Sequence, residues 1–128
     1  MALSRRGFLG AAGMLAGGLA LGTEAPPKKF RICVIGDTKL GGFGHDLHRA
    51  WETRTDVEIV GLSDPDEAGR AKRAAECGAA RTYADHVEML EKERPYLVTV
   101  CPRSPVRHRD YLLAAAAVGA HGFMEKPL

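Results

Sequence analysis

The sequence predicts an α/β fold in which a parallel sheet carries helices on both faces. Two observations support this prediction. Apolar, strand-like runs alternate with helical patterns from Phe30 to the end of the chain, an order typical of right-handed strand–helix–strand crossovers. The first of these runs ends abruptly in a glycine-rich turn, after which a helical pattern begins. The 128 residues suffice for one such domain and not for two.

The individual elements follow from periodicity. The first strand is expected over 30–35 and should be buried on both faces, because its residues are almost continuously apolar. A helix should follow over 42–53, where Leu47, Ala50 and Trp51 recur at i, i+3 and i+4. The later elements alternate in the same way, with strands over 57–62, 81–83, 96–101 and 121–124 and helices over 65–77, 85–93 and from the cap at Ser104-Pro105 to Gly119.

Polar or conformationally special residues follow the predicted strands. In a parallel sheet the carboxyl ends of the strands share one edge, and ligands bind beyond that edge. We therefore expect one site there, built from residues 36–41, Asp64, Pro102-Arg103 and Glu125-Lys126-Pro127.

The glycine turn resembles the opening of a dinucleotide-binding unit. Strand, glycine turn and helix bring backbone N–H groups and a helix N-terminus close to a pyrophosphate. The spacing is Gly36-x-Thr38-x-x-Gly41, so a threonine stands at the middle glycine of the G-x-G-x-x-G pattern. Its Cβ lies where the backbone should approach the pyrophosphate, although its hydroxyl can donate to that group. The alternative is a tight turn without a ligand, since glycine serves any turn that needs a positive φ.

Asp64 follows the second predicted strand, 23 residues after Gly41. An acid at this interval can accept hydrogen bonds from both hydroxyls of the adenosine ribose, and it repels a 2′-phosphate, which favours NAD over NADP. The alternative is a capping box, with Asp64 as N-cap, Pro65 at the first helical position and an acid at the third. Arg70 lies one turn into this helix, within reach of a 2′-phosphate, so NADP stays open.

The first 25 residues have the pattern of an export signal. Arg5-Arg6 form a twin-arginine motif, and the run from 7 to 22 is uncharged and rich in Gly, Ala and Leu. We expect 1–25 to be a Tat signal with its cleavage region, recognised by the Tat translocon and directing the protein to the periplasm. An uncleaved N-terminal membrane anchor and an ordinary buried helix are the alternatives. Residues 26–29 are expected to form a linker, and 30–128 the domain.

Bulk composition excludes several classes of function. The net charge of +2 and the lack of basic residues interleaved with aromatics argue against nucleic acid as a partner. Cys33 and Cys101 lie in apolar runs and should be buried, and no C-x-x-C pair is present. Since the five histidines also lack a ligand spacing, no metal site is predicted.

The chain from about 29 to 128 resembles the Gfo/Idh/MocA oxidoreductases, which include glucose–fructose oxidoreductase and inositol dehydrogenase. The likeness is greatest to exported bacterial members that share Gly36-Asp37-Thr38, the run from Gly41 to His45, and Pro102-Arg103. Four features carry the family resemblance: the glycine turn, Ser63-Asp64-Pro65-Asp66, His108 at the start of the last helix, and Glu125-Lys126-Pro127.

The resemblance implies roles for particular residues in a Rossmann-type domain. Lys126 would lie beside the nicotinamide and the reacting carbon, as acid/base or orienting cation, and the Lys126–Pro127 bond would be cis. A solvated lysine is the alternative, and His108 is interpreted as a packing residue rather than a catalyst. The implied cofactor-binding residues are Gly36, Asp37, Thr38, Gly41, Asp64, Pro102 and Glu125.

The implied activity is hydride transfer between NAD(P) and a sugar or polyol. The family continues into an α/β domain that supplies most of the substrate pocket, so we interpret the chain as the cofactor half of an enzyme whose full-length form is a possible homo-oligomer. A non-catalytic nucleotide-binding or partner-docking module is the alternative. An S-adenosylmethionine enzyme is disfavoured, because Glu125-Lys126-Pro127 follows the fifth strand.

Overall fold

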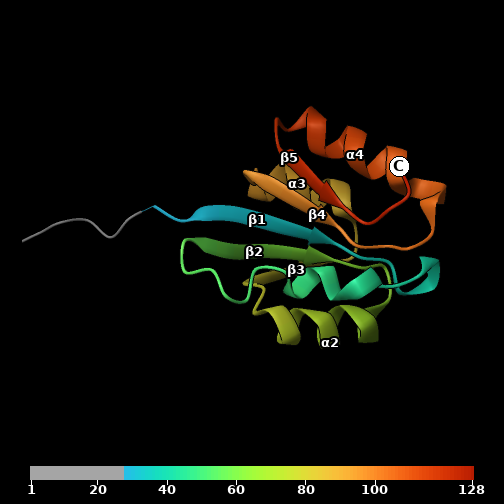
Figure 1. Cartoon of the computed structure of the whole chain (residues 1–128), viewed down its shortest axis with the longest axis horizontal. Helices are drawn as coiled ribbons and strands as arrows, with labels where there is room; N and C mark the ends of the chain where they lie inside the picture. The colour runs from blue at the N-terminus through green and yellow to red at the C-terminus, as the bar shows by residue number, and fades with distance from the viewer. Residues whose placement is uncertain (1–27) are drawn as a thin grey trace, which may run out of the picture.

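The computed structural model describes residues 28–128, so the predicted export signal lies outside the described residues. Five parallel strands form one sheet in the order β3-β2-β1-β4-β5 (Figure 1). This arrangement confirms the predicted α/β class. The strands are β1 (Phe30–Ile35), β2 (Val57–Ser63), β3 (Arg81–Tyr83), β4 (Leu97–Val100) and β5 (His121–Met124), and the helices are α2 (Glu67–Cys77), α3 (His86–Glu93) and α4 (His108–Ala117).

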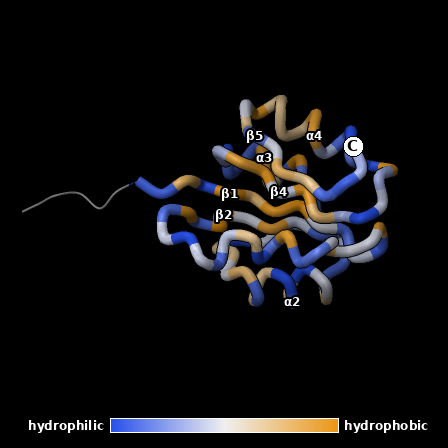
Figure 2. The backbone as a smooth tube through the Cα atoms, in the orientation of Figure 1, coloured by the Kyte–Doolittle hydropathy of each residue, from blue (hydrophilic) through white to orange (hydrophobic). Residues whose placement is uncertain are grey.

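Helices cover both faces of the sheet (Figure 1). Side chains alternate along β1, so Cys33 and Ile35 face the cluster formed with Met89 of α3 and Tyr111 of α4. The intervening residues of β1 face α2 and the segment before β2, in a second cluster that includes Phe43 and Ala74. Figure 2 shows the apolar strands at the centre of the molecule. Cys33 and Cys101 are both buried, as predicted. Burial raises the pKa of the Cys33 thiol to about 12.

The first predicted helix is absent, which corrects the expectation for 42–53. A 3₁₀ segment, η2 (Gly44–Arg49), takes its place and is interrupted by positive φ at His45 (48°) and Asp46 (52°). Gly41 and Gly42 have positive φ of 89° and 67° and turn the chain before a helix could begin. The glycine turn is therefore followed by 3₁₀ structure rather than by an α-helix.

The alternative role of Asp64 as an N-cap is not observed, and the predicted cap at Ser104 is wrong. The N-cap of α2 is Asp66, whose carboxylate accepts a hydrogen bond from the Gly69 amide at 2.8 Å, so Asp64 is left for another role. Ser104 makes no capping hydrogen bond, because a 3₁₀ turn, η3 (Pro105–Arg107), intervenes before α4. Among the described residues, no helix is both long and apolar enough to cross a membrane.

A buried carboxylate ties β1, β3 and α3 together. Glu93 accepts hydrogen bonds from the guanidinium groups of Arg31 and Arg81 and from the hydroxyl of Tyr83. Its side chain is only 4% exposed. The hydrogen bond from Arg81, followed by that from Tyr83, holds the pKa of Glu93 below its usual value despite burial.

Candidate functional site

The predicted site residues gather at one edge of the sheet. Gly36 follows β1, Asp64 follows β2, Pro102 lies just beyond β4 and Glu125 follows β5. Since these strands are neighbours in the order β2-β1-β4-β5, the four positions form a row along their carboxyl ends. One segment of the chain, residues 38–45, crosses this row, and we call it the covering segment.

Asp64 is fully buried, and residues of the chain itself satisfy its carboxylate. The hydroxyl of Thr38 donates to Oδ2 at 2.6 Å, and the Thr38 amide lies 3.1 and 3.2 Å from the two oxygens. The Asp66 amide donates to Oδ1 at 2.9 Å. Thr38 thus makes with Asp64 the kind of hydrogen bond that a ribose hydroxyl would make.

Gly36 lies directly beneath the ring of Phe43. A Cβ placed on Gly36 would come within 1.9 Å of Cζ of that ring. Phe43 is 7% exposed; the guanidinium carbon of Arg73 lies 5.3 Å from its ring centroid, and the His48 ring packs edge-on at 5.1 Å. Because Gly36 has no side chain, the ring of Phe43 can pack directly against its backbone.

Glu125 is 5% exposed and pairs with the covering segment through His45. The distance from His45 Nδ1 to Glu125 Oε2 is 2.7 Å, and the Lys126 amide donates to Oε1 at 3.1 Å. The hydrogen bond from His45 holds the pKa of Glu125 below its usual value. Gly44 permits this approach, because a Cβ there would lie 2.5 Å from Oε2.

The backbone of the covering segment is anchored at both ends. Asp37 is buried; its side chain caps the Thr38–Leu40 turn, and its carbonyl accepts hydrogen bonds from Leu40 and Gly42. The Ser104 amide donates to the Leu40 carbonyl at 3.0 Å, beside Gly41, and the Gly44 amide donates to the Cys101 carbonyl at 2.9 Å. The segment is thereby tied to the loop that follows β4.

Lys126 is exposed at the end of β5, and its peptide bond to Pro127 is cis, as predicted. Its ammonium group makes no ion pair with residues 28–128. His108 is buried, with Nδ1 2.6 Å from the Pro127 carbonyl oxygen and Nε2 2.6 Å from that of Pro102. This packing role, which the sequence analysis favoured, joins the loops after β4 and β5.

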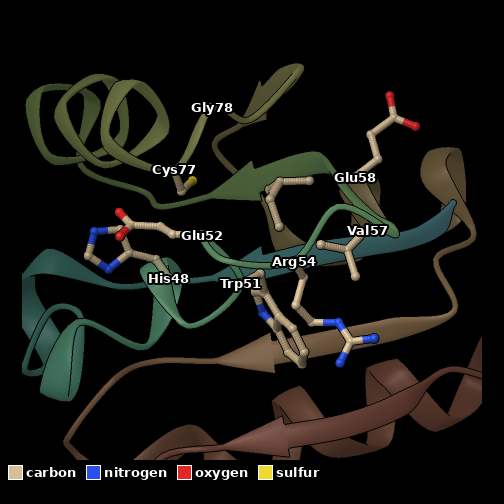
Figure 3. Close-up of a pocket in the computed structure, with 9 residues that line it drawn as sticks. His48, Trp51, Glu52, Arg54, Val57, Glu58, Cys77 and Gly78 are labelled. Atoms are coloured by element: carbon tan, nitrogen blue, oxygen red, sulfur yellow. The ribbon is translucent and has the colours of Figure 1, made fainter.

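Three hollows differ in their relation to this edge. The crevice between the ends of β1, β2 and β3 has a volume of only about 40 Å³, and Ser63, which lines it, has a buried hydroxyl without a hydrogen-bond partner in the described part of the chain. A hollow of about 360 Å³ lies on the outer side of the glycine run, between Arg73 and Arg103. A third, of about 300 Å³, lies beside the first half of β2 and away from the predicted site (Figure 3).

Sequence reasoning missed Phe43 and His45 as parts of the site. The run Gly41-Gly42-Phe43-Gly44-His45 was an available signal, because a large apolar ring between glycines, followed by a histidine, is not needed to make a turn. Within residues 28–128, the structure places no three His, Cys, Asp or Glu side chains where they could hold a metal ion.

Comparisons with known proteins place this geometry in context. Residues 30–128 match the model of the GFO_IDH_MocA family, described as an oxidoreductase family with an NAD-binding Rossmann fold. The chain is 32% identical over 99 residues to D-glucoside 3-dehydrogenase of Escherichia coli K12, covering 76% of this chain and 27% of that protein. It is 33% identical over 101 residues to inositol 2-dehydrogenase of Pseudomonas savastanoi pv. phaseolicola, covering 77% and 29%.

A solved structure has the same fold. The myo-inositol 2-dehydrogenase of Lactobacillus plantarum superposes with a TM-score of 0.64 at 24% identity, covering 78% of this chain and 29% of that one. The chain thus spans less than a third of the length of each of these relatives.

Proposed function

The chain belongs to the Gfo/Idh/MocA oxidoreductase family through its NAD-binding Rossmann domain, and on that premise we propose that it is the cofactor half of an enzyme that oxidises or reduces a sugar or polyol. The observation that carries the proposal is the row of Gly36, Asp64 and Glu125, with Lys126 beside it, along one edge of a parallel sheet. The relatives named above are dehydrogenases of a glucoside and of inositol, which supports this substrate class.

The residue types at this edge suit a nicotinamide dinucleotide. Glycine after β1 allows close approach, and the acid after β2 is an acceptor suited to ribose hydroxyls. However, Phe43, Thr38 and His45 contact Gly36, Asp64 and Glu125 respectively. The residues at this edge are therefore of the types that bind a dinucleotide, but in this structure Gly36, Asp64 and Glu125 are contacted by other residues of the same chain.

We assign the roles as follows. NAD supplies the ring that accepts or gives up the hydride. Asp64 accepts hydrogen bonds from the adenosine ribose, and Pro102 and Glu125 line the nicotinamide side. Lys126, exposed and without an acidic partner among the described residues, holds the proton of the reacting hydroxyl group or guides it.

The substrate pocket is proposed to be completed outside this chain. The relatives are more than three times as long as the matched region, and in the resembled family a further α/β domain provides most of the substrate contacts. Assembly of the full-length enzyme as a homo-oligomer belongs to the same proposal. Export through the Tat translocon to the periplasm rests on Arg5-Arg6 and the uncharged run that follows.

Calorimetric titration of the whole chain with NAD and with NADP tests the cofactor assignment. Asp64→Asn keeps the shape of the side chain and removes its charge. We expect affinity for NAD to fall by about 1.5–3 kcal/mol, the scale of hydrogen bonds to a charged group, and affinity for NADP to be spared. Asp66→Asn is the matched control, since Asp66 caps α2 without being assigned to the ribose.

The narrow crevice at the ends of β1, β2 and β3 favours the second candidate, a partner-docking module that turns over no cofactor. If the wild-type chain and both variants bind neither dinucleotide at millimolar concentration, the result favours the partner-docking module over the cofactor-binding domain. Equal loss of NAD and NADP in Asp64→Asn would instead give Asp64 a structural role through Thr38.

A further inference from the structure

The covering segment contacts three of the seven implied cofactor-binding residues, and it contains two of the others, Thr38 and Gly41. Thr38 bonds to Asp64 at the end of β2, Phe43 covers Gly36 at the end of β1, and His45 pairs with Glu125 after β5. These positions extend from the adenosine end of the predicted site to its nicotinamide end. A turn with a purely structural role would not need to satisfy all three.

The crevice at the ends of β1, β2 and β3 has little free space, and the larger hollow of about 360 Å³ lies on the outer side of the covering segment. Pockets that enclose small molecules and cofactors usually measure about 300–1,000 Å³, whereas the crevice from Gly36 to Tyr111 holds about 40 Å³. The hydroxyl of Ser63, a residue that lines this crevice, is buried without a hydrogen-bond partner in the described chain, so it is available to a water or to a ligand.

Two of the three contacts are made by exposed side chains, although the backbone of the covering segment is tied to the loop after β4. Thr38 and His45 are exposed, although their polar atoms bond to the buried carboxylates of Asp64 and Glu125. If these two side chains moved away, little apolar surface would become exposed to water. Gly41 and Gly42 lie within the segment at positive φ, and glycine changes conformation at low steric cost. Phe43 is the one of the three contact residues that is anchored by burial.

We propose that residues 38–45 are a built-in competitor for the dinucleotide, which closes the cofactor site until Thr38, Phe43 and His45 withdraw from Asp64, Gly36 and Glu125. This inference rests on the proposed function. In the closed state, the Thr38 hydroxyl takes the place of a ribose hydroxyl on Asp64. Apparent affinity is then the affinity of the open state reduced by the fraction of molecules that are open.

The test measures NADH binding by stopped-flow quenching of Trp51, the single tryptophan of the chain. His45→Ala and Thr38→Val each remove one polar contact of the closed state. We expect each to tighten the apparent Kd by about three- to tenfold, because tenfold corresponds to about 1.4 kcal/mol, the scale of one hydrogen bond. Lys39→Ala is the matched control, since Lys39 is exposed in the same segment and its side chain contacts none of the three groups.

Kinetics and hydrogen exchange provide a second readout. In the wild type, the observed binding rate should level off at high NADH concentration, because opening precedes binding. Without ligand, the Thr38 amide, which donates to Asp64, should exchange faster in His45→Ala than in the wild type or in Lys39→Ala.

The outcomes separate the two proposals. Measurable NADH binding that is equal in all variants, with a linear dependence of rate on concentration, overturns the competitor and leaves the proposed function intact. Weaker binding in Thr38→Val or His45→Ala also overturns it, because these side chains would then contact the dinucleotide themselves. If no variant binds NADH at millimolar concentration, the proposed function fails and the competitor fails with it.

Discussion

The contact between Phe43 and Gly36 can be tested by a double-mutant cycle. An alanine Cβ at position 36 would lie 1.9, 2.3 and 2.5 Å from Cζ, Cε1 and Cε2 of the Phe43 ring. Those three atoms are the ones that leucine lacks. Phe43→Leu should therefore create the space that Gly36→Ala needs, and the two substitutions should compensate one another.

The magnitudes follow from burial and overlap. Gly36 does not have a positive φ, so alanine is not strained there, and the cost of Gly36→Ala comes from crowding, at about 1–3 kcal/mol. Phe43→Leu loses part of a buried ring and should cost about 1–2 kcal/mol. Because the leucine relieves the overlap, the double variant should be more stable than the sum of the single effects by about 1–2 kcal/mol.

Urea unfolding of the full chain, followed by circular dichroism, measures these free energies. Gly78→Ala combined with Phe43→Leu is the control: no atom lies within 4 Å of a Cβ at position 78, and its φ of 69° makes the alanine costly by itself. That pair should be additive within about 0.5 kcal/mol. If the effects of Gly36→Ala and Phe43→Leu were additive, the Phe43 ring would not lie on Gly36. The proposal that the covering segment closes the cofactor site would then lose one of its three supporting contacts.

Three further predictions concern stability, catalysis and export. Glu93→Gln should lower the free energy of unfolding by about 2 kcal/mol at pH 7. Because the folded-state pKa of Glu93 lies below the usual 4.5, the wild type has this advantage above pH 4.5 and loses it as the pH falls through the lowered pKa; an unchanged difference in urea melts at lower pH would contradict this reasoning. In a fusion to the α/β domain of a relative, Lys126→Ala should reduce kcat by about 10²–10⁴-fold and leave dinucleotide affinity unchanged; near-normal turnover would make Lys126 a bystander. Replacing both Arg5 and Arg6 by lysine should abolish periplasmic accumulation in a Tat-competent bacterium, measured by fractionation, and unimpaired export would remove the basis for the signal.

Much of the architecture could be predicted because it depends on local pattern. The apolar runs of β1, β2 and β4 mark strands buried on both faces, and Gly78 ends α2 with φ of 69°. Strands that alternate with helices are nearly always joined by right-handed crossovers, so the parallel sheet followed from their order. The row of site positions followed in turn, since residues after parallel strands share one edge.

The helix expected over 42–53 could not be rejected from periodicity alone. Leu47, Ala50 and Trp51 have helical spacing, but glycine conformation and the positive φ of His45 and Asp46 decide the backbone there. The N-cap of α2 had a similar ambiguity, because Asp64 and Asp66 both precede the helix. Asp66 takes the cap, since Thr38, 26 residues before Asp64 in the chain, bonds to the Asp64 carboxylate.

The sequence by itself determined the fold class, the edge that holds the site and the residue types at that edge, because these depend on periodicity and on which residues follow each strand. Only the tertiary structure decided what those residues contact. The pairs Thr38–Asp64, Phe43–Gly36 and His45–Glu125 join a loop to the ends of three different strands. Such contacts depend on how the backbone turns at Gly41 and Gly42, and a glycine allows many directions of turn without indicating which one the packed chain will adopt.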